Sequence, residues 1–399
     1  MEENNKWKNL PVDILEQIIK CLPLREYLAV NAILGDNYSR ISDSNDIPNQ
    51  FCLPLSEPPQ VLLRNEVSAW FFSLSTLTMH HPKTKLLESS QLCHGSFEEW
   101  LIVCDYTVDE GSATVFFLNP VTNARIMIPS KLYFPSSDLF VAKVVTSSKP
   151  GSDRYLACLL DNFCQIAIYR PFDKSWAIIE LHKNSDFCFK DLEIVDTKLY
   201  VITDKTSHSI LLIYDLKDST NGPPEGEFLA LVPKLRPVES SITDNRCNTI
   251  NDTLPFLAKD EALGELYLIY MICNVEYALN FNFGSIFVKP PEATNIEVFK
   301  LDMNKDPIGW QKVRLDDRVA FVSNCKSVII SRDKLHCNQE LIGRNSIYFG
   351  FNFPCSGDSQ SGLRLGVFCL NDRSIKYFPV DTSKDCPMPH PIWIVPSLL

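Results

Sequence analysis

The sequence predicts a mainly β protein in which a small all-α domain precedes a β-propeller-like domain of about six or seven blades. Three observations support this prediction. Apolar residues recur with helical spacing only between residues 7 and 34. After about residue 60, apolar runs are four to eight residues long, rich in Val, Ile, Phe and Tyr, and bounded by turn residues. A loose strand–turn–strand repeat then recurs along the chain.

The N-terminal segment contains two short helical patterns joined at a proline. Leu10-Pro11 is predicted to open the first helix, because the N–H that proline lacks has no intrahelical partner in the first turn. Asp13 places a negative charge near the positive end of the helix dipole. Pro23 ends this helix, and a second helical pattern spans residues 24–34. The first helix carries one apolar stripe: Ile14, Leu15, Ile18, Ile19 and Leu22.

Two helices this short cannot bury all of their apolar surface alone. The stripe therefore packs either on the following domain, as a helical cap, or on a helix bundle of a partner protein. The residues that distinguish these alternatives are Trp7, Leu10-Pro11, Asp13-Ile14-Leu15, Ile18, Leu22 and LREYL at 24–28.

Together these residues resemble an F-box, the motif that binds a Skp-type adaptor and through it a cullin–RING ubiquitin ligase. The resemblance implies that the adaptor-contacting or motif-core positions are Leu10, Pro11, Ile14, Leu15, Ile18, Leu22 and Leu28. An F-box usually continues with a Val-Cys-x-x-Trp-like stretch, whereas this chain has Ile33, Leu34, and Asn37 or Tyr38 at the corresponding positions. The missing Cys and Trp leave a degenerate motif as an alternative.

Composition narrows the classes of function. The chain has 399 residues, a net charge of −11 and a pI near 5.2. This charge argues against binding to nucleic acid and to an anionic membrane surface, both of which need clustered Lys and Arg. The polar N-terminus does not resemble a signal peptide. The longest apolar run, residues 266–273, is far shorter than the roughly 20 residues of a membrane helix.

The cysteines also point to an intracellular protein. Fourteen cysteines are scattered without a Cys-x-x-Cys pair, the close spacing that a zinc finger or ribbon needs. Reduced, buried thiols are the expected state, and neither a metal nor a cofactor is expected. We therefore expect a cytoplasmic or nuclear location.

The predicted domains are residues 3–50 (helical), 51–60 (a Pro-rich linker) and 61–399 (β). Repeat units begin about 45–50 residues apart, or at larger gaps that leave room for a degenerate copy. This period suits four-stranded blades, with Trp176 and Trp310 between neighbouring blades. Two stacked β-sandwich domains are the alternative. The repeat units begin at Val115, Ile166, Leu211, Ile296 and Gly366.

Further stretches resemble one plant F-box family, whose long C-terminal domain has no assigned function and is sometimes described as kelch-like. They include CHGSFEEWLIV at 93–103, FLNPVTNARIMIP, DLEIVDTKLYVI at 191–202, LGELYLIY at 263–270, IEVFKLD at 296–302, NSIYFGFN at 345–352 and WIVPSLL at 393–399. This resemblance implies a substrate-recognition subunit of an SCF-type E3 ubiquitin ligase that holds an unknown target protein. The alternative is a ligase-independent interaction protein with a degenerate F-box.

No motif in the sequence predicts a catalytic site. Adjacent strand residues point to opposite sides, so His80-His81 does not predict a metal site. Gly95-Ser96 lacks a Gly-x-Ser-x-Gly frame and is expected to form a turn. The acidic pairs Glu98-Glu99, Asp260-Glu261 and Asp316-Asp317 are expected in exposed turns. A propeller enzyme such as a glycosidase remains an alternative by fold analogy, and it requires acidic residues that converge around the central channel.

Overall fold

The computed structural model describes residues 59–395 apart from several gaps. The predicted helical domain, 3–50, and most of the predicted linker lie outside the described residues. The described residues form strands and two short 3₁₀ helices, η3 (Val108–Glu110) and η4 (Arg332–Lys334). None of their helices is long and apolar enough to cross a membrane. The gaps are 65–68, 75, 81–85, 121, 137–138, 151–152, 162, 182–187, 206–207, 218–221, 234–247, 281–283, 288–291, 336–341, 353–362 and 381–390.

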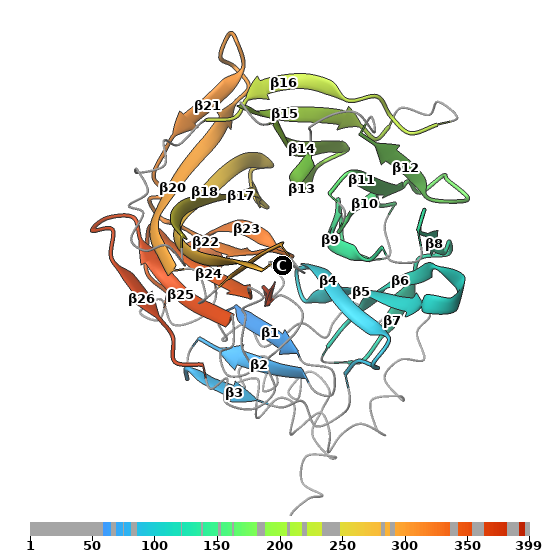
Figure 1. The fold of residues 1–399 in the computed structure, drawn as a ribbon, viewed down its shortest axis with the longest axis horizontal. Helices are drawn as coiled ribbons and strands as arrows, with labels where there is room; N and C mark the ends of the chain where they lie inside the picture. Colours follow the sequence, from blue (N-terminus) through green and yellow to red (C-terminus); the bar gives the residue numbers. More distant parts are fainter. Residues whose placement is uncertain are drawn as a thin grey trace, which may run out of the picture.

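The described strands form six blades around a central axis (Figure 1). Four blades are separate sheets, and the other two are joined into one ten-stranded sheet. From the axis outwards, blade 1 contains β27 (Ile392–Ile394), β1 (Gln60–Arg64), β2 (Ala69–Ser73) and β3 (Thr78–His80). Blade 2 contains β4 (Gln91–Phe97), β5 (Trp100–Thr107), β6 (Ser112–Leu118) and β7 (Arg125–Met127), with β8 (Leu132–Tyr133) beside β6. Blade 3 contains β9 (Val141–Thr146), β10 (Leu156–Leu160), β11 (Gln165–Tyr169) and β12 (Ala177–Glu180).

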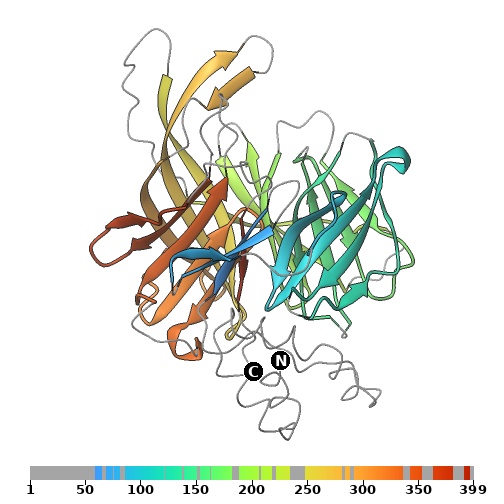
Figure 2. The ribbon, with the colours of Figure 1, turned by 90° about the horizontal axis from the view of Figure 1, so that it is seen from below.

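The next two blades follow the same order. Blade 4 contains β13 (Cys188–Val195), β14 (Lys198–Lys205), β15 (His208–Asp215) and β16 (Glu227–Leu231). Blade 5 contains β17 (Asn248–Asp260), β18 (Glu265–Asn280), β20 (Glu292–Asp302) and β21 (Gly309–Lys312), with β19 (Gly284–Phe287) beside β18. The strands of blade 5 extend beyond the other blades on one side of the propeller (Figure 2).

Blade 6 departs from this order. It contains β23 (Ser327–Ser331), β22 (Arg318–Ser323), β24 (Ser346–Asn352), β25 (Leu363–Cys369) and β26 (Ile375–Tyr377). β22 runs parallel to β24 and antiparallel to β23, and β23 pairs in parallel with β17. We call residues 318–331 the axial hairpin. Its turn lies at the centre of the propeller, because Cys325 Sγ contacts the Ala142 carbonyl of blade 3 and Lys326 lies over the Phe97 ring of blade 2.

The ring closes through strands from the two ends of the described chain. β27 pairs antiparallel with β1, and Trp393 lies opposite Val61. The Trp393 side chain is fully buried, and its Nε1–H donates to the Val322 carbonyl at 3.0 Å. Ser96 Oγ donates to the Trp393 carbonyl at 2.6 Å. Blade 1 is therefore tied to blades 2 and 6 at its inner strand.

The repeat in the sequence corresponds to the outer hairpins of the blades. Each of the five units falls on the last but one strand of a blade and its connection to the outermost strand, from β6–β7 in blade 2 to β25–β26 in blade 6. The large gap between the units at 211 and 296 holds the long strands β17 and β18 of blade 5 instead of a degenerate copy. The alternative of two β-sandwich domains is wrong.

Both tryptophans lie where the propeller prediction places them. Trp176 packs on the apolar cluster between blades 2 and 3, and its Nε1–H donates to the Ser130 carbonyl at 3.0 Å. Trp310 packs on the cluster between blades 4 and 5. Large apolar side chains pack between neighbouring blades and so cover the faces of each sheet. Removing this apolar surface from water stabilises the folded propeller.

The prediction of a turn at Gly95-Ser96 is wrong, because both residues lie inside β4. The turn follows at Glu98-Glu99, where Glu98 has a φ of 49°. Glycine is needed at position 95 because a Cβ there would lie 2.2 Å from the Val144 carbonyl oxygen of blade 3. The glycine thus marks a close approach of two inner strands, a common reason for glycine within a strand.

Candidate functional site

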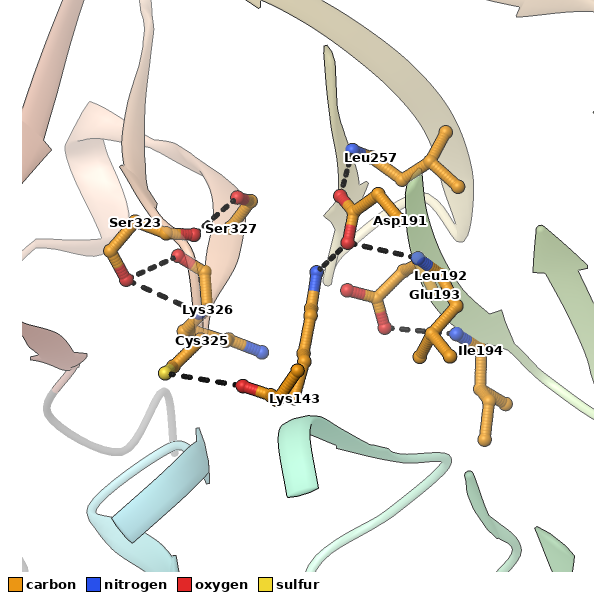
Figure 3. Close-up of polar contacts among 11 residues, drawn as sticks. Lys143, Asp191, Leu192, Glu193, Ile194, Leu257, Ser323, Cys325, Lys326 and Ser327 are labelled. Atoms are coloured by element: carbon orange, nitrogen blue, oxygen red, sulfur yellow. Dashed lines mark hydrogen bonds and ion pairs between the residues drawn. The ribbon is translucent and has the colours of Figure 1, made fainter. Parts of the chain in front are cut away.

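Charged side chains meet at the axis of the propeller, and Figure 3 shows the contacts among them. Lys143 of β9 and Asp191 of β13 form an ion pair with 2.6 Å between Nζ and Oδ1, and their side chains are only 3% and 6% exposed. Asp191 also accepts the backbone N–H groups of Leu192 at 2.9 Å and Leu257 at 2.7 Å. One carboxylate therefore joins blades 3, 4 and 5. Burial raises the pKa of Asp191, and the Lys143 ammonium and the two N–H donors oppose that rise.

Glu193 lies two residues further along β13 and so points to the same side of the strand as Asp191. Its Oε1 accepts the Ile194 N–H at 2.9 Å. Its Oε2 is buried and has no hydrogen-bond partner among the described residues. Burial raises the pKa of Glu193, and the positive charges of Lys326 and Lys143 oppose the rise.

The axial hairpin adds a second set of charges. Lys326 Nζ lies 3.4 Å from Glu261 Oε1, and Lys259 Nζ lies 3.3 Å from Glu261 Oε2. Burial alone raises the pKa of Glu261, but the two lysines outweigh it and hold that pKa below its ordinary value. Ser323 Oγ donates to the Lys326 carbonyl at 3.1 Å and accepts the Lys326 N–H at 3.2 Å. The hairpin turn is therefore held in shape where it meets the axis.

This axial network, defined as Lys143, Asp191, Glu193, Lys259, Glu261 and Lys326, combines three lysines with three acids. Removing charges from water is costly, and the cost is offset only where each charge has partners of good geometry. Acidic residues do converge near the axis, as the glycosidase alternative required, but Asp191 is bonded to a lysine and to backbone. Among the described residues, no group of three or more His, Cys, Asp or Glu side chains is placed to hold a metal ion.

A cavity of about 340 Å³ lies between blades 4 and 5, and no residue of the axial network lines it. Three turns meet there: β13–β14, β17–β18 and β20–β21. Its floor is formed by apolar residues of the cluster between the two blades, and its rim carries polar and charged side chains. This cavity is thus a concave site that is separate from the axial network.

The seven predicted adaptor-binding positions lie outside the described residues. His80 lies on β3 within 3.1 Å of Thr78 Oγ1, and His81 is also outside the described residues. The structure therefore does not test the adaptor-binding positions or the His80-His81 pair.

The predicted exposure of the acidic pairs is correct for one pair and wrong for two single residues. Asp316 and Asp317 are exposed. Glu99 is only 7% exposed, and Asp260 only 1%. The partners of Asp260 offset the cost of its burial. Its Oδ1 accepts the N–H groups of Ala262 and Leu263 in the following turn, and its Oδ2 lies 3.3 Å from Arg318 Nε. A carboxylate can therefore be buried in a turn when backbone and a cation satisfy it.

The axial network was not predicted from the sequence. The signal for Lys143 is a charge inside an otherwise apolar inner strand, VAKVVT, where both of its neighbours are apolar. Asp191 carries a weaker signal, because in CFKDLEIV it lies between Lys190 and Leu192 and only one neighbour is apolar. Its partner could not have been identified, because the pairs join different blades.

Comparison with known proteins identifies a family. No curated protein matches the chain. The chain is similar to a structure described as YjhT, with a TM-score of 0.34 and 11% identity over 80% of this chain and 97% of that chain. It is also similar to a putative 6-phosphogluconolactonase from Bacteroides fragilis, with a TM-score of 0.32 and 10% identity over 85% of this chain and 96% of that chain. The family described as KIB1-4 beta-propeller matches residues 71–378, a range that includes strands of all six blades, and the chain belongs to this family.

Proposed function

We propose that the chain is a non-catalytic receptor subunit of an SCF-type E3 ubiquitin ligase. In this proposal the propeller holds a target protein, and the N-terminal motif binds the Skp-type adaptor. The ubiquitin chemistry belongs to other subunits. The proposal also places the chain in the cytoplasm, the nucleus or both.

One observation carries the propeller part of the proposal. At the axis, the carboxylate of Asp191 is bonded to Lys143 and to the backbone of two blades, so it braces the ring. A rigid scaffold of this kind positions its turns and loops for recognition, which is where binding residues concentrate. A β-propeller is compatible with a role in protein interaction.

The adaptor part rests on the apolar stripe of the N-terminal motif. Burial of five or six aliphatic side chains gives about 1.5–3 kcal/mol each, before the cost of association is subtracted. We expect the double substitution Ile14→Asp plus Leu15→Asp to abolish co-purification of the full chain with a plant Skp-type adaptor. Two carboxylates on the stripe cannot be buried against an apolar partner without a large desolvation cost.

The matched control is Ile14→Leu plus Leu15→Ile, which keeps the stripe apolar and is expected to retain the adaptor. Thermal unfolding of the propeller should be the same in both variants. If the aspartate variant co-purifies with the adaptor as well as the unchanged chain does, the proposal of F-box docking is wrong.

A second candidate is a ligase-independent interaction protein with a degenerate F-box. It is favoured by the absence of the Cys and Trp that an F-box usually carries in its third helix, where this chain has Ile33, Leu34, and Asn37 or Tyr38. Proximity labelling with the full chain separates the two candidates. The ligase role predicts labelled adaptor and cullin, whereas the second candidate predicts labelled partner proteins without them.

A further inference from the structure

The cavity between blades 4 and 5 has an apolar floor. Val195, Leu266 and Leu301 line it, and all three belong to the buried cluster between the two blades. Met303 lines its rim and is 46% exposed. Leu263 is 54% exposed and precedes Gly264, which also lines the cavity. Apolar surface therefore continues from the floor of the cavity to its edge.

The charges of the cavity differ in how far they are neutralised. Glu265 is fully engaged, because Lys300 Nζ lies 2.6 Å from its Oε1 and the Tyr267 hydroxyl donates to its Oε2 at 2.9 Å. Burial alone raises the pKa of Glu265, but these hydrogen bonds and the positive charges of Lys300 and Arg318 lower it below its ordinary value. Glu265 and Lys300 thus satisfy each other and leave little net charge.

Asp302 is the second carboxylate that lines the cavity. It is half-buried, and its Oδ1 accepts the Asn304 N–H at 3.0 Å. No ion pair and no other hydrogen bond to the Asp302 carboxylate is present among the described residues. The cavity therefore combines an apolar floor with one negative charge that no cation of the described chain neutralises.

We propose that this cavity binds the side chain of an arginine or lysine in an exposed segment of the target protein. Such side chains combine an apolar stem with a cationic end. The stem packs on Leu266, Leu301 and Met303, and the cationic end reaches Asp302. A cavity of about 340 Å³ is at the small end of the range for ligand sites, which suits a side chain better than a large cofactor. The net charge of −11 also attracts a basic partner. This inference rests on the proposed function, because it names the chemistry of the target.

The test uses the full chain with ¹³C-labelled methionine methyl groups, in which Met303→Leu assigns the Met303 signal. The probes are the peptides acetyl-Ala-Arg-Ala-amide and acetyl-Ala-citrulline-Ala-amide, which differ in charge but hardly in shape. We expect the arginine peptide to shift the Met303 signal in a saturable way. The citrulline peptide should bind about fivefold more weakly than the arginine peptide.

Two variants separate a local contact from the general field of the protein. Asp302→Asn should weaken binding of the arginine peptide about fivefold, to the level of the citrulline peptide. Asp306→Asn removes the same charge from the same turn at a residue that does not line the cavity, and it should leave binding unchanged. The inference is overturned if neither peptide shifts the signal, if both bind equally, or if the two variants weaken binding equally.

These results are distinguishable from a failure of the proposed function. If the peptides do not bind but proximity labelling still finds the adaptor and a target, only the cavity inference fails. If the arginine peptide binds as expected but the adaptor is never recovered, the ligase role fails and the cavity inference stands.

Discussion

Asp191 at the axis and Asp302 at the cavity carry the same charge in two different settings. Asp191 is buried and is bonded to Lys143 and to two backbone N–H groups from two blades. Asp302 is half-buried and accepts one hydrogen bond from its own turn. A buried charge must be satisfied within the protein, whereas a half-exposed one is solvated by water until a partner arrives. The axis therefore holds the fold together, and the cavity leaves a charge for recognition.

The largest expected effect is loss of the cation at the axis. Lys143→Met leaves Asp191 buried without its counter-ion, and we expect the free energy of unfolding to fall by about 3–5 kcal/mol. Lys300→Met, which breaks the half-exposed pair with Glu265 at the cavity, should cost at most about 1 kcal/mol. Urea unfolding followed by tryptophan fluorescence measures both.

A double variant sharpens this result. Lys143→Met combined with Asp191→Leu removes both buried charges, so it should be more stable than Lys143→Met alone. Equal losses for Lys143→Met and Lys300→Met would contradict the distinction between the axis and the cavity.

Glu99 tests the same distinction with a carboxylate that is buried without a bonded cation. Burial raises its pKa from 4.5 to about 7, and its Oε2 has no hydrogen-bond partner among the described residues. The folded state therefore keeps a proton between pH 4.5 and about 7 that the unfolded state releases, so stability falls as the pH rises through this window. The full difference in pKa corresponds to about 3 kcal/mol.

We expect Glu99→Gln to remove this fall in stability with rising pH. Relative to the unchanged chain, the variant should gain up to about 3 kcal/mol of stability when the pH rises from about 4 to about 8. Urea unfolding at several pH values measures the two slopes. Parallel curves for the two proteins would show that Glu99 titrates normally in the folded state.

Two glycines extend the comparison to the backbone. Gly95→Ala places a Cβ against the Val144 carbonyl at the axis, and we expect a loss of about 3 kcal/mol, because two blades would have to move apart. Gly264→Ala, at the cavity, meets nothing closer than 3.9 Å but has a φ of 63°, so strain of about 1–2 kcal/mol is expected.

Asparagine at positions 95 and 264 distinguishes a steric clash from strain caused by a positive φ. It tolerates a positive φ better than alanine does, so Gly264→Asn should be more stable than Gly264→Ala. At position 95 the larger side chain should be worse than alanine. The thermal unfolding midpoints of the four variants test this order, and rescue by asparagine at position 95 would contradict the steric explanation.

The smallest expected effect is that of Asp302→Asn on stability. Within the described part of the chain, its carboxylate accepts a single hydrogen bond, from the backbone of its own turn, so the free energy of unfolding should change by less than about 0.5 kcal/mol. A large loss in urea unfolding would show that Asp302 supports the fold instead of being available to a partner.

Much of the fold was predictable where it depends on local pattern. Strands such as β20 and the turn that follows it were recognisable from apolar runs and turn residues, and Trp310 lies between blades as the repeat indicated. The sequence prediction failed at Gly95, at Glu99 and at Asp260. Chain segments distant in sequence set the environment of Gly95, which Val144 of blade 3 approaches, and of Asp260, whose Oδ2 lies 3.3 Å from Arg318 Nε.

The candidate sites were less predictable than the fold. Lys143 and Asp191 are 48 residues apart, and Val195 and Met303 at the cavity belong to different blades. No local spacing signals these pairs. The adaptor-binding positions, in contrast, form a local helical pattern, and they stay a prediction because they lie outside the described residues.

The sequence by itself determined the mainly β class, the outer hairpin of each repeat and the apolar character of the surfaces between blades, because these depend on side-chain periodicity and turn chemistry within a few residues. Only the tertiary structure decided the number of blades, the insertion of the axial hairpin, and which charges are buried and which stay available. Those features depend on contacts between strands far apart in the chain, where the cost of removing a charge from water is met by partners that no local pattern reveals.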